Sequence, residues 1–240
     1  MAIAYNGGLN RPLKHHLSTI MHIHRQHASK HMVVWYWPVR VMHWTMVAAF
    51  TTAMLTRNSV LDPRPHIYAG YVMGGVLALR ILYGFLANDL AAFRRFPPRP
   101  IKGLRYMWDL LRGRARNYLG HNPAGALAIY AMLILGVCTV TTGYTYYEYG
   151  FDYDIEWVKD WHHHFAYTWF WVVCIHLFGI TAGSLAHKEF LPMVMVTGHK
   201  VKFEERFSLA AAGLTLLMLF LRLLNLIVLL FGGKGFILRK

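Results

Sequence analysis

Long apolar runs constrain the fold of this sequence more than any other feature. Four of them cover residues 38–56, 66–86, 123–143 and 162–186. Each run is close to the length, about 20 residues, that an α-helix needs to cross the hydrocarbon core of a bilayer. Because that core offers no water to the backbone, segments of this kind form helices. The sequence therefore predicts an all-α membrane protein built on a four-helix transmembrane bundle.

A fifth apolar run lies near the end of the chain, at 208–231, and contains Arg222 and Asn225 near its middle. A central arginine costs about 2.5–3.5 kcal/mol on insertion scales, and the surrounding Leu, Ile, Val and Phe offset that cost. We therefore predict a fifth, C-terminal transmembrane helix. The chain then has three parts: a basic, His-rich cytoplasmic tail (1–34), the four-helix domain (35–200) and a C-terminal helix with a basic end (201–240).

Charge is distributed unevenly along the chain, which carries 25 Lys and Arg against 11 Asp and Glu. The basic residues gather before the first run, between the second and third runs, and after the fourth. Acidic residues gather instead in segment 144–161: Glu148, Asp152, Asp154, Glu156 and Asp160. The positive-inside rule then predicts a multi-pass protein of a bacterial inner membrane, with a cytoplasmic N-terminus and the acidic loop in the periplasm. Apolar runs between the basic stretches argue against nucleic-acid binding.

Ionisable residues inside membrane helices are functional candidates. The four main runs contain no Asp or Glu, which disfavours a proton pump or an ion-coupled transporter. They contain histidines instead: His43, His66, His162, His163, His164 and His176. The cysteines Cys138 and Cys174 also lie in apolar runs and form no Cys-x-x-Cys pair, so we interpret them as packing residues and exclude covalent c-type haem.

Two of these histidines, His162 and His176, are 14 residues apart in the fourth run. On a helix they lie about 40° apart around the axis and about 21 Å apart along it. His163 and His164 point away from that face. A haem iron takes one imidazole from each side of the ring, so His162 and His176 each need a partner from another helix.

Depth in the bilayer selects these partners. His43 lies near the inner start of the first helix, at the depth of His176, and His66 starts the second helix at the outer side, at the depth of His162. The sequence therefore predicts two non-covalent haem b groups, each with two histidine ligands. Histidine at both axial positions leaves no open site for substrate, so the predicted chemistry is one-electron transfer without a catalytic residue of its own.

Three further residues are candidate contacts of these groups, each with a simpler interpretation. Arg80 lies 14 residues after His66 and is placed to bind a haem propionate, or to reach the interface from a helix end. His187, 11 residues after His176, is placed to touch a propionate or a quinone, or to be solvated. His121, beside the helix cap Asn122, has the same two interpretations. Six more histidines lie in the tail, where a disordered basic segment is favoured over a metal site.

Several stretches also resemble a known family, and they occur in the order that the family has: WPVRVMHW (37–44), PHIYAGYVMGGVLALRILYGF (65–85), GHNPAGALAIY (120–130), HHHFAYTWFWVVCIHLFG (162–179) and SLAHKEFLPMVMVTGHK (184–200). They are similar to the bacterial cytochrome b-561 superfamily, which includes the b-type cytochrome subunits of NiFe-hydrogenases and relatives associated with di-haem cytochromes c. The last stretch looks closer to the cytochrome c-associated branch.

This resemblance implies haem ligands at the same four positions: His43, His66, His162 and His176. It also implies a subunit that passes electrons between a redox partner, such as a hydrogenase or a cytochrome c, and the quinone pool. We expect the acidic loop to help dock that partner, and quinone to react near the inner haem beside the basic loop. A haem or metal-ion transporter and a purely structural membrane anchor are the alternative functions.

Overall fold

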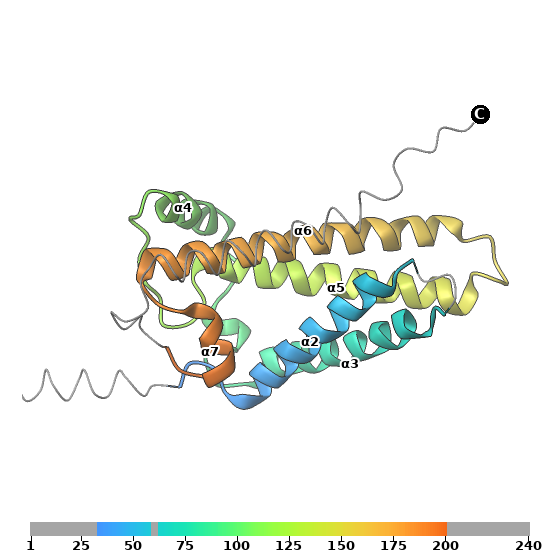
Figure 1. The fold of residues 1–240 in the computed structure, drawn as a ribbon, viewed down its shortest axis with the longest axis horizontal. Helices are drawn as coiled ribbons and strands as arrows, with labels where there is room; N and C mark the ends of the chain where they lie inside the picture. Colours follow the sequence, from blue (N-terminus) through green and yellow to red (C-terminus); the bar gives the residue numbers. More distant parts are fainter. Residues whose placement is uncertain (1–32, 59–61, 201–240) are drawn as a thin grey trace, which may run out of the picture.

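The computed structural model describes residues 33–58 and 62–200. Its helices, in chain order, are α2 (Trp37–Thr56), α3 (Arg64–Leu86), the 3-10 turn η1 (Phe93–Arg95), α4 (Pro100–Leu111), α5 (Pro123–Tyr149), α6 (Glu156–His187) and α7 (Leu191–Thr197) (Figure 1). Within these ranges the only bridge of β type joins Val33 to His199, which confirms the predicted all-α class. The predicted helix at 208–231 and the histidines of the tail lie outside the described residues.

The four long helices alternate in direction, as predicted. One end of the bundle gathers the start of α2, the end of α3, the start of α5 and the end of α6, together with α4 and α7 (left in Figure 1). The opposite end holds the α2–α3 and α5–α6 connections. We call the end with α4 and α7 the inner end and the opposite end the outer end.

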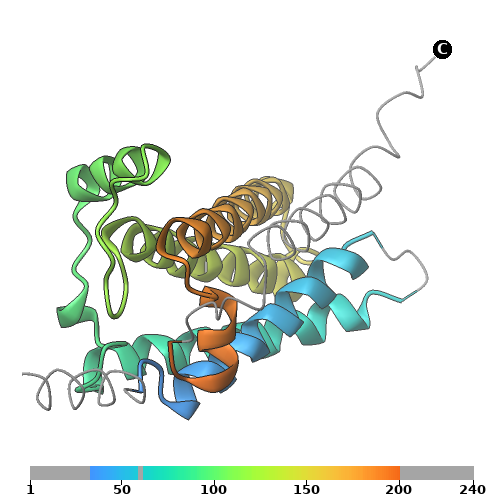
Figure 2. The same ribbon diagram turned by 60° about the vertical axis from the view of Figure 1, so that its left-hand side comes forward.

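Helices α2 and α3 form one antiparallel pair and α5 and α6 form another. The two pairs are joined where α3 packs on α5, whereas α2 does not pack along α6. Figure 2 shows the α2–α3 pair lying as a separate layer beside α5 and α6. The bundle is therefore tight on its α3–α5 side and less closely packed on its α2–α6 side.

The predicted helix starts are confirmed by their capping residues. Pro38 lies in the first turn of α2, where a missing N–H costs no hydrogen bond. At the start of α5, the Asn122 side chain accepts a 2.7 Å hydrogen bond from the Gly125 N–H. The cap satisfies a backbone donor that would otherwise have no partner inside the helix.

The third and fourth helices are longer than predicted at the outer end. The third extends to Tyr149 rather than residue 143, and the fourth begins at Glu156 rather than residue 162. The predicted loop at 144–161 therefore shrinks to residues 150–155, and most of its acidic residues lie on helix ends. Hydropathy marks only the part of a helix inside lipid, while the 32 residues of α6 extend about 48 Å against a core of about 30 Å.

Three of the described helices, α3, α5 and α6, have the length and apolar composition of membrane spans. The predicted first span, α2, is not among them, because Arg40, His43 and four threonines lower its hydropathy. The outward faces of the bundle are nonetheless strongly apolar, with side chains such as Phe85 and Ile134 more than half exposed. Exposed apolar surface on this scale is what a lipid-facing bundle presents.

Helix α4 lies in a segment that the sequence analysis treats only as a basic loop. Its buried residues, Gly103 and Tyr106, pack toward α5 and α6. The opposite face exposes an apolar stripe at helical spacing: Ile101, Leu104, Trp108 and Leu111. Arginines and a lysine flank the stripe, a composition typical of helices that lie in the headgroup region of a membrane. The short helix α7 is likewise absent from the sequence prediction.

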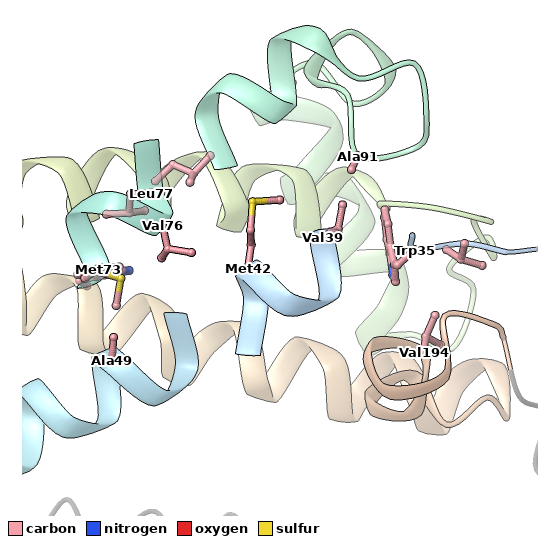
Figure 3. Close-up of a cluster of buried hydrophobic side chains, with 12 residues drawn as sticks. Trp35, Val39, Met42, Ala49, Met73, Val76, Leu77, Ala91 and Val194 are labelled. Atoms are coloured by element: carbon pink, nitrogen blue, oxygen red, sulfur yellow. The ribbon is translucent and has the colours of Figure 1, made fainter. Parts of the chain in front are cut away.

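A cluster of buried apolar side chains holds the inner half of the bundle together (Figure 3). Val39 and Met42 at the start of α2, with Trp35 just before it, meet Val76 and Leu77 of α3 in this cluster. Burying a side chain of this size contributes about 1.5–3 kcal/mol. The cluster extends to Trp169 of α6 and therefore links the two helix pairs between the levels of the histidines.

Candidate cofactor site

The structure brings His66 of α3 and His162 of α6 together at the outer level. Their ring centres are 6.1 Å apart and their planes are nearly perpendicular, at 81°. The two residues are 96 positions apart in the sequence, so the contact depends on the packing of the two helix pairs. This is the pair that depth and helical phase predict.

Backbone carbonyls fix the orientation of both outer imidazoles. His66 Nδ1 lies 2.9 Å from the carbonyl oxygen of Ala53, and His162 Nδ1 lies 2.9 Å from that of Thr139. A carbonyl only accepts, so each Nδ1 carries the proton and each Nε2 keeps its lone pair. Histidines that bind a metal are usually held in this way through their second nitrogen.

Glycines leave room around the outer pair. A Cβ atom at Gly143 of α5 would lie 2.8 Å from Cε1 and 2.9 Å from Nδ1 of His162, so only glycine lets the ring lie against α5. At Gly70, one turn after His66, a Cβ atom would meet no described atom within 4 Å. The outer imidazoles are therefore closely supported on one side and face open space on another.

His43 of α2 and His176 of α6 lie at the inner level, close enough for their imidazoles to interact electrostatically. Within the described ranges they do not make the direct ring contact of the outer pair. The Nδ1 atom of His43 is buried and has no hydrogen-bond partner among the described residues. The His43 ring stands edge-on to Trp44, with ring centres 5.4 Å apart. The inner pair therefore lies within electrostatic range, without the direct ring contact or the carbonyl-fixed Nδ1 atoms of the outer pair.

Arg80 of α3 is a buried cation, only 5% exposed, at this inner level. Its Nη2 donates a 3.2 Å hydrogen bond to the Ala91 carbonyl, and its guanidinium lies 5.3 Å from the ring centre of Phe93. Nη1 has no hydrogen-bond partner among the described residues, and no carboxylate there forms an ion pair with it. Asp89 attracts this charge electrostatically but forms no ion pair with it, so the guanidinium has unused capacity to bind an anion.

His121 lies in the loop before α5, between two aromatic rings. Its ring centre is 4.4 Å from that of Trp35 and 4.2 Å from that of Phe96. Burial, together with electrostatic repulsion from Arg80 and His176, lowers its pKa to about 3. His121 is therefore neutral at physiological pH and belongs to the same inner cluster as Arg80 and His176.

His187, at the end of α6, has a hydrogen-bond partner within the protein. Its Nε2 lies 3.2 Å from the hydroxyl oxygen of Tyr106 on α4. Burial raises the pKa of the Tyr106 hydroxyl, so it stays protonated. The contact connects α4 to the end of α6, and the predicted role of His187 toward a propionate or a quinone would have to coexist with it.

An aromatic contact separates the two levels. Phe50 of α2 and Trp169 of α6 have ring centres 5.1 Å apart. Trp169 lies seven residues from both His162 and His176, and Phe50 lies seven residues after His43. A Cβ atom at Gly136 of α5 would lie 2.9 Å from the Trp169 ring, so glycine makes room for the indole. The two histidine levels are therefore distinct sites and not one cluster.

The outer geometry fits a metal held between two axial imidazoles. With metal–nitrogen bonds of about 2 Å and each ring centre about 1 Å behind its nitrogen, two such imidazoles stand about 6 Å apart. The observed separation of the ring centres is 6.1 Å. Over residues 33–58 and 62–200, no group of three or more His, Cys, Asp or Glu side chains could hold a metal ion. The buried Arg80, which forms no ion pair among the described residues, suits the carboxylates that haem carries.

Several residues of the site were not predicted from the sequence. The carbonyls of Ala53 and Thr139 leave no trace in a sequence, because every residue has one. The Phe50–Trp169 contact had a usable signal, since both residues stand seven positions from predicted ligands. Gly143 had none, because glycines are common in membrane helices.

Comparison with known proteins places the chain in a family. The family described as prokaryotic cytochrome b561 matches residues 34–198. The chain is 23% identical over 216 positions to a probable Ni/Fe-hydrogenase B-type cytochrome subunit of Rhodobacter capsulatus, a match covering 71% of this chain and 82% of that protein. It is 22% identical over 213 positions to the subunit of the same name from Azotobacter vinelandii, covering 70% and 88%.

A third relative, the probable Ni/Fe-hydrogenase 1 B-type cytochrome subunit of Escherichia coli K12, is 27% identical over 143 positions, covering 49% of this chain and 61% of that protein. These names belong to the hydrogenase branch, rather than to the branch that the stretch at 184–200 favours. No solved structure matches the chain. The chain belongs to the prokaryotic cytochrome b561 family, and it is a multi-pass membrane protein of electron transport that carries b-type haem.

Proposed function

We propose that the chain is a di-haem cytochrome b subunit that carries electrons across the inner membrane, between a hydrogenase-like redox partner and quinone. The observation that carries the proposal is the outer histidine pair, His66 and His162, at the separation of two axial ligands. Carbonyl bonds to both Nδ1 atoms support it, because they leave the two Nε2 atoms free to bind iron.

In this proposal His66 and His162 hold an outer haem, and His43 and His176 hold an inner haem. Bound haem supplies a one-electron ferric/ferrous couple. The protein fixes the depth of each site through the 14-residue spacing on α6, which corresponds to about 21 Å. Phe50 and Trp169 occupy the space between the two levels. The residues thereby define a route across the bilayer with no opening for substrate at either iron.

Arg80 binds a propionate of the inner haem in this arrangement. Its buried guanidinium would gain a directly paired carboxylate, whereas Asp89 acts on it without forming an ion pair. His121 is neutral and therefore adds no second positive charge beside Arg80. A single fixed cation raises the potential of a nearby haem, because it disfavours the extra positive charge of the ferric state.

The redox partner docks at the outer end in this proposal. The α5–α6 connection carries Asp152 and Asp154 and exposes aromatic side chains, of which Phe151 is 99% exposed. Acidic groups around exposed aromatic rings suit a basic partner surface with an apolar centre. The names of the relatives support a partner of the hydrogenase class. The basic inner end supports a cytoplasmic N-terminus.

Quinone reacts at the inner end in this proposal. A groove of about 590 Å³ lies there between α2 and α7, lined among others by Trp37, Arg40 and Trp44. Trp44 stands against the His43 ring and donates a 3.0 Å hydrogen bond to the Met195 carbonyl. The groove therefore offers an apolar, aromatic surface one side chain away from an inner ligand. Its lining comes from α2 and α7 rather than from the basic loop at 87–122 that the sequence analysis favours.

Haem stoichiometry tests the proposal most simply. A pyridine haemochrome assay on the purified chain should give two haem b per polypeptide, with the optical spectrum of low-spin iron in the reduced and oxidised states. A value near zero would contradict the cytochrome and favour a transporter that only passes haem or metal through. One haem per chain would refute the two-site arrangement.

Electron transfer separates the proposal from a structural anchor. In membranes that contain the partner subunit, His43→Ala and His66→Ala should each remove one low-spin haem and reduce partner-to-quinone electron transfer by at least tenfold. Unchanged transfer in both variants would favour the anchor. Exposed His164 supplies the matched control, because His164→Ala should preserve both haems and the rate.

A further inference from the structure

The 14-residue spacing between His162 and His176 on α6 recurs on α2 and on α3. In these two helices the second residue of the pair is an arginine instead of a histidine. On α3, Arg80 follows the outer ligand His66 by 14 residues and reaches the inner level. On α2, Arg57 follows the inner ligand His43 by the same 14 residues and reaches the outer level. Fourteen residues return a side chain to within about 40° of its starting direction, about 21 Å further along the helix. Each of the two helices therefore presents one histidine and one arginine, at opposite levels.

Contacts place Arg57 at the level of the outer histidines. The Ala53 carbonyl that fixes His66 belongs to the preceding turn of α2, four residues before Arg57 and on the same face. The Arg57 guanidinium lies 5.7 Å from the ring centre of Tyr167 on α6. Its charge is thus directed from α2 toward α6, across the side of the bundle where these helices do not pack along each other.

We infer that Arg57 is the carboxylate-binding residue of the outer site, and that it pairs with a propionate of the outer haem as Arg80 does at the inner site. The inference rests on the proposed function. It assigns one arginine to each haem. Helix α2 supplies His43 to the inner haem and Arg57 to the outer haem, and α3 supplies His66 to the outer haem and Arg80 to the inner haem. The α2–α3 pair then supplies one histidine and one arginine to each site.

The surrounding charges fit this assignment. Arg64, the other arginine at this end of the described bundle, is strongly exposed and bound to Asp62, with Nε 2.8 Å from Oδ1. It therefore points to solvent. Arg57 is only partly exposed and lies against an aromatic ring, a setting in which a guanidinium binds carboxylate more strongly than it does in water.

Redox titration of the purified protein tests the inference. We expect two haems per chain and two potential waves in the unmodified protein. Arg57→Gln should retain both haems and shift one wave to lower potential, because removing a positive charge stabilises the ferric state. Arg80→Gln should shift the other wave, and the double variant should shift both. Arg57→Lys should restore most of the shift, while the control Arg64→Gln should leave both waves in place.

Two results would overturn the assignment of Arg57. One is that Arg57→Gln lowers thermal stability but moves neither wave, which would make Arg57 a structural residue at the end of α2. The other is that Arg57→Gln and Arg80→Gln move the same wave. Haem content separates these failures from a failure of the proposed function: fewer than two haems in the unmodified protein would overturn both.

Discussion

The outer and inner histidine levels of this bundle are built differently. At the outer level, the two imidazoles face each other directly and a backbone carbonyl orients each of them. At the inner level the histidines interact only at longer range, the Nδ1 atom of His43 is buried without a partner, and the buried Arg80 forms no ion pair among the described residues. The outer site is thus complete in its protein parts, whereas the inner site has polar groups that a bound anion would satisfy.

The difference shows that a ligand site can be prepared in two ways. Backbone hydrogen bonds to a ligand's second nitrogen hold the ring whether or not the metal is present. A buried cation that forms no ion pair is costly to the empty protein, and a bound anion lowers that cost. Of the two proposed sites, the inner one should therefore gain more stability from its cofactor, because Arg80 is buried whereas Arg57 is partly exposed to solvent.

The largest expected effect is the removal of an outer ligand. His162→Ala should eliminate the low-spin outer haem and keep the inner one, so that the haemochrome content falls from two to one. His163→Ala is the matched control, because this neighbouring histidine is exposed on another face of α6 and should leave both haems bound. Equal losses in the two variants would show that position on α6 does not select the ligand.

A smaller effect is expected from crowding the outer ligand. Gly143→Ala places a methyl group 2.8 Å from His162 Cε1, so the ring must turn away from the Thr139 carbonyl. We expect the outer haem to become partly high-spin or to bind several-fold more weakly, with no change at the inner level. The control is Gly75→Ala on α3, where a Cβ meets no described atom within 4 Å. Unchanged outer spectra in Gly143→Ala would contradict the close support that the structure gives to His162.

The inner level should show a pH dependence of stability to which His121 contributes. His121 has a pKa of about 3 in the folded chain, below its ordinary value of about 6.5, so the unfolded chain binds more protons between these pH values. Stability should therefore fall as the pH is lowered from 7 toward 4, by at most about 1.4 kcal/mol per pH unit from this residue. Thermal unfolding in detergent at several pH values measures this slope.

The matched variant for this slope is His121→Phe, which keeps an aromatic ring between Trp35 and Phe96 but cannot titrate. Its unfolding temperature should depend less on pH than that of the unmodified protein. His164→Phe changes an exposed histidine and serves as the control. A slope that is identical in His121→Phe and the unmodified protein would contradict a buried, neutral His121.

The smallest effect is expected at His187, a predicted cofactor contact that has Tyr106 as its partner in the structure. Tyr106→Phe removes the hydroxyl that lies 3.2 Å from His187 Nε2. The loss of this one hydrogen bond should lower stability by about 1 kcal/mol. Both haem potentials should stay unchanged, as measured by redox titration. A shift of the inner wave would instead place His187 in contact with the cofactor.

Much of the helix arrangement and of the histidine site can be predicted from the sequence, because a membrane restricts the length and the composition of the helices that cross it. Apolar length indicates the long helices, Pro38 and Asn122 mark two of their starts, and the 14-residue spacing on α6 selects His162 and His176 from among adjacent histidines. His66 and His162 are neighbours in space because alternating helices bring residues of equal depth together. These features depend only on helix geometry and on the thickness of a bilayer.

The remaining features depend on packing and could not be predicted in the same way. The apolar stripe of α4 was hidden among arginines that indicated only a basic loop, although residues 101, 104, 108 and 111 have helical spacing. Trp169 reaches Phe50 only because Gly136 gives it room, and that requires knowledge of how α5 faces α6. Arg57 could not be predicted as a site residue from the apolar runs, because it lies just beyond the end of the first one.

Pairing by depth is the central claim, and double variants test it most directly. His66→Ala/His162→Ala removes both ligands of one level, so one low-spin bis-histidine haem should remain in optical and electron paramagnetic resonance spectra. His43→Ala/His162→Ala removes one ligand from each level, so no low-spin bis-histidine haem should remain. If the cross-level variant kept one such haem while the same-level variant kept none, the histidines would be paired differently and the account would be wrong.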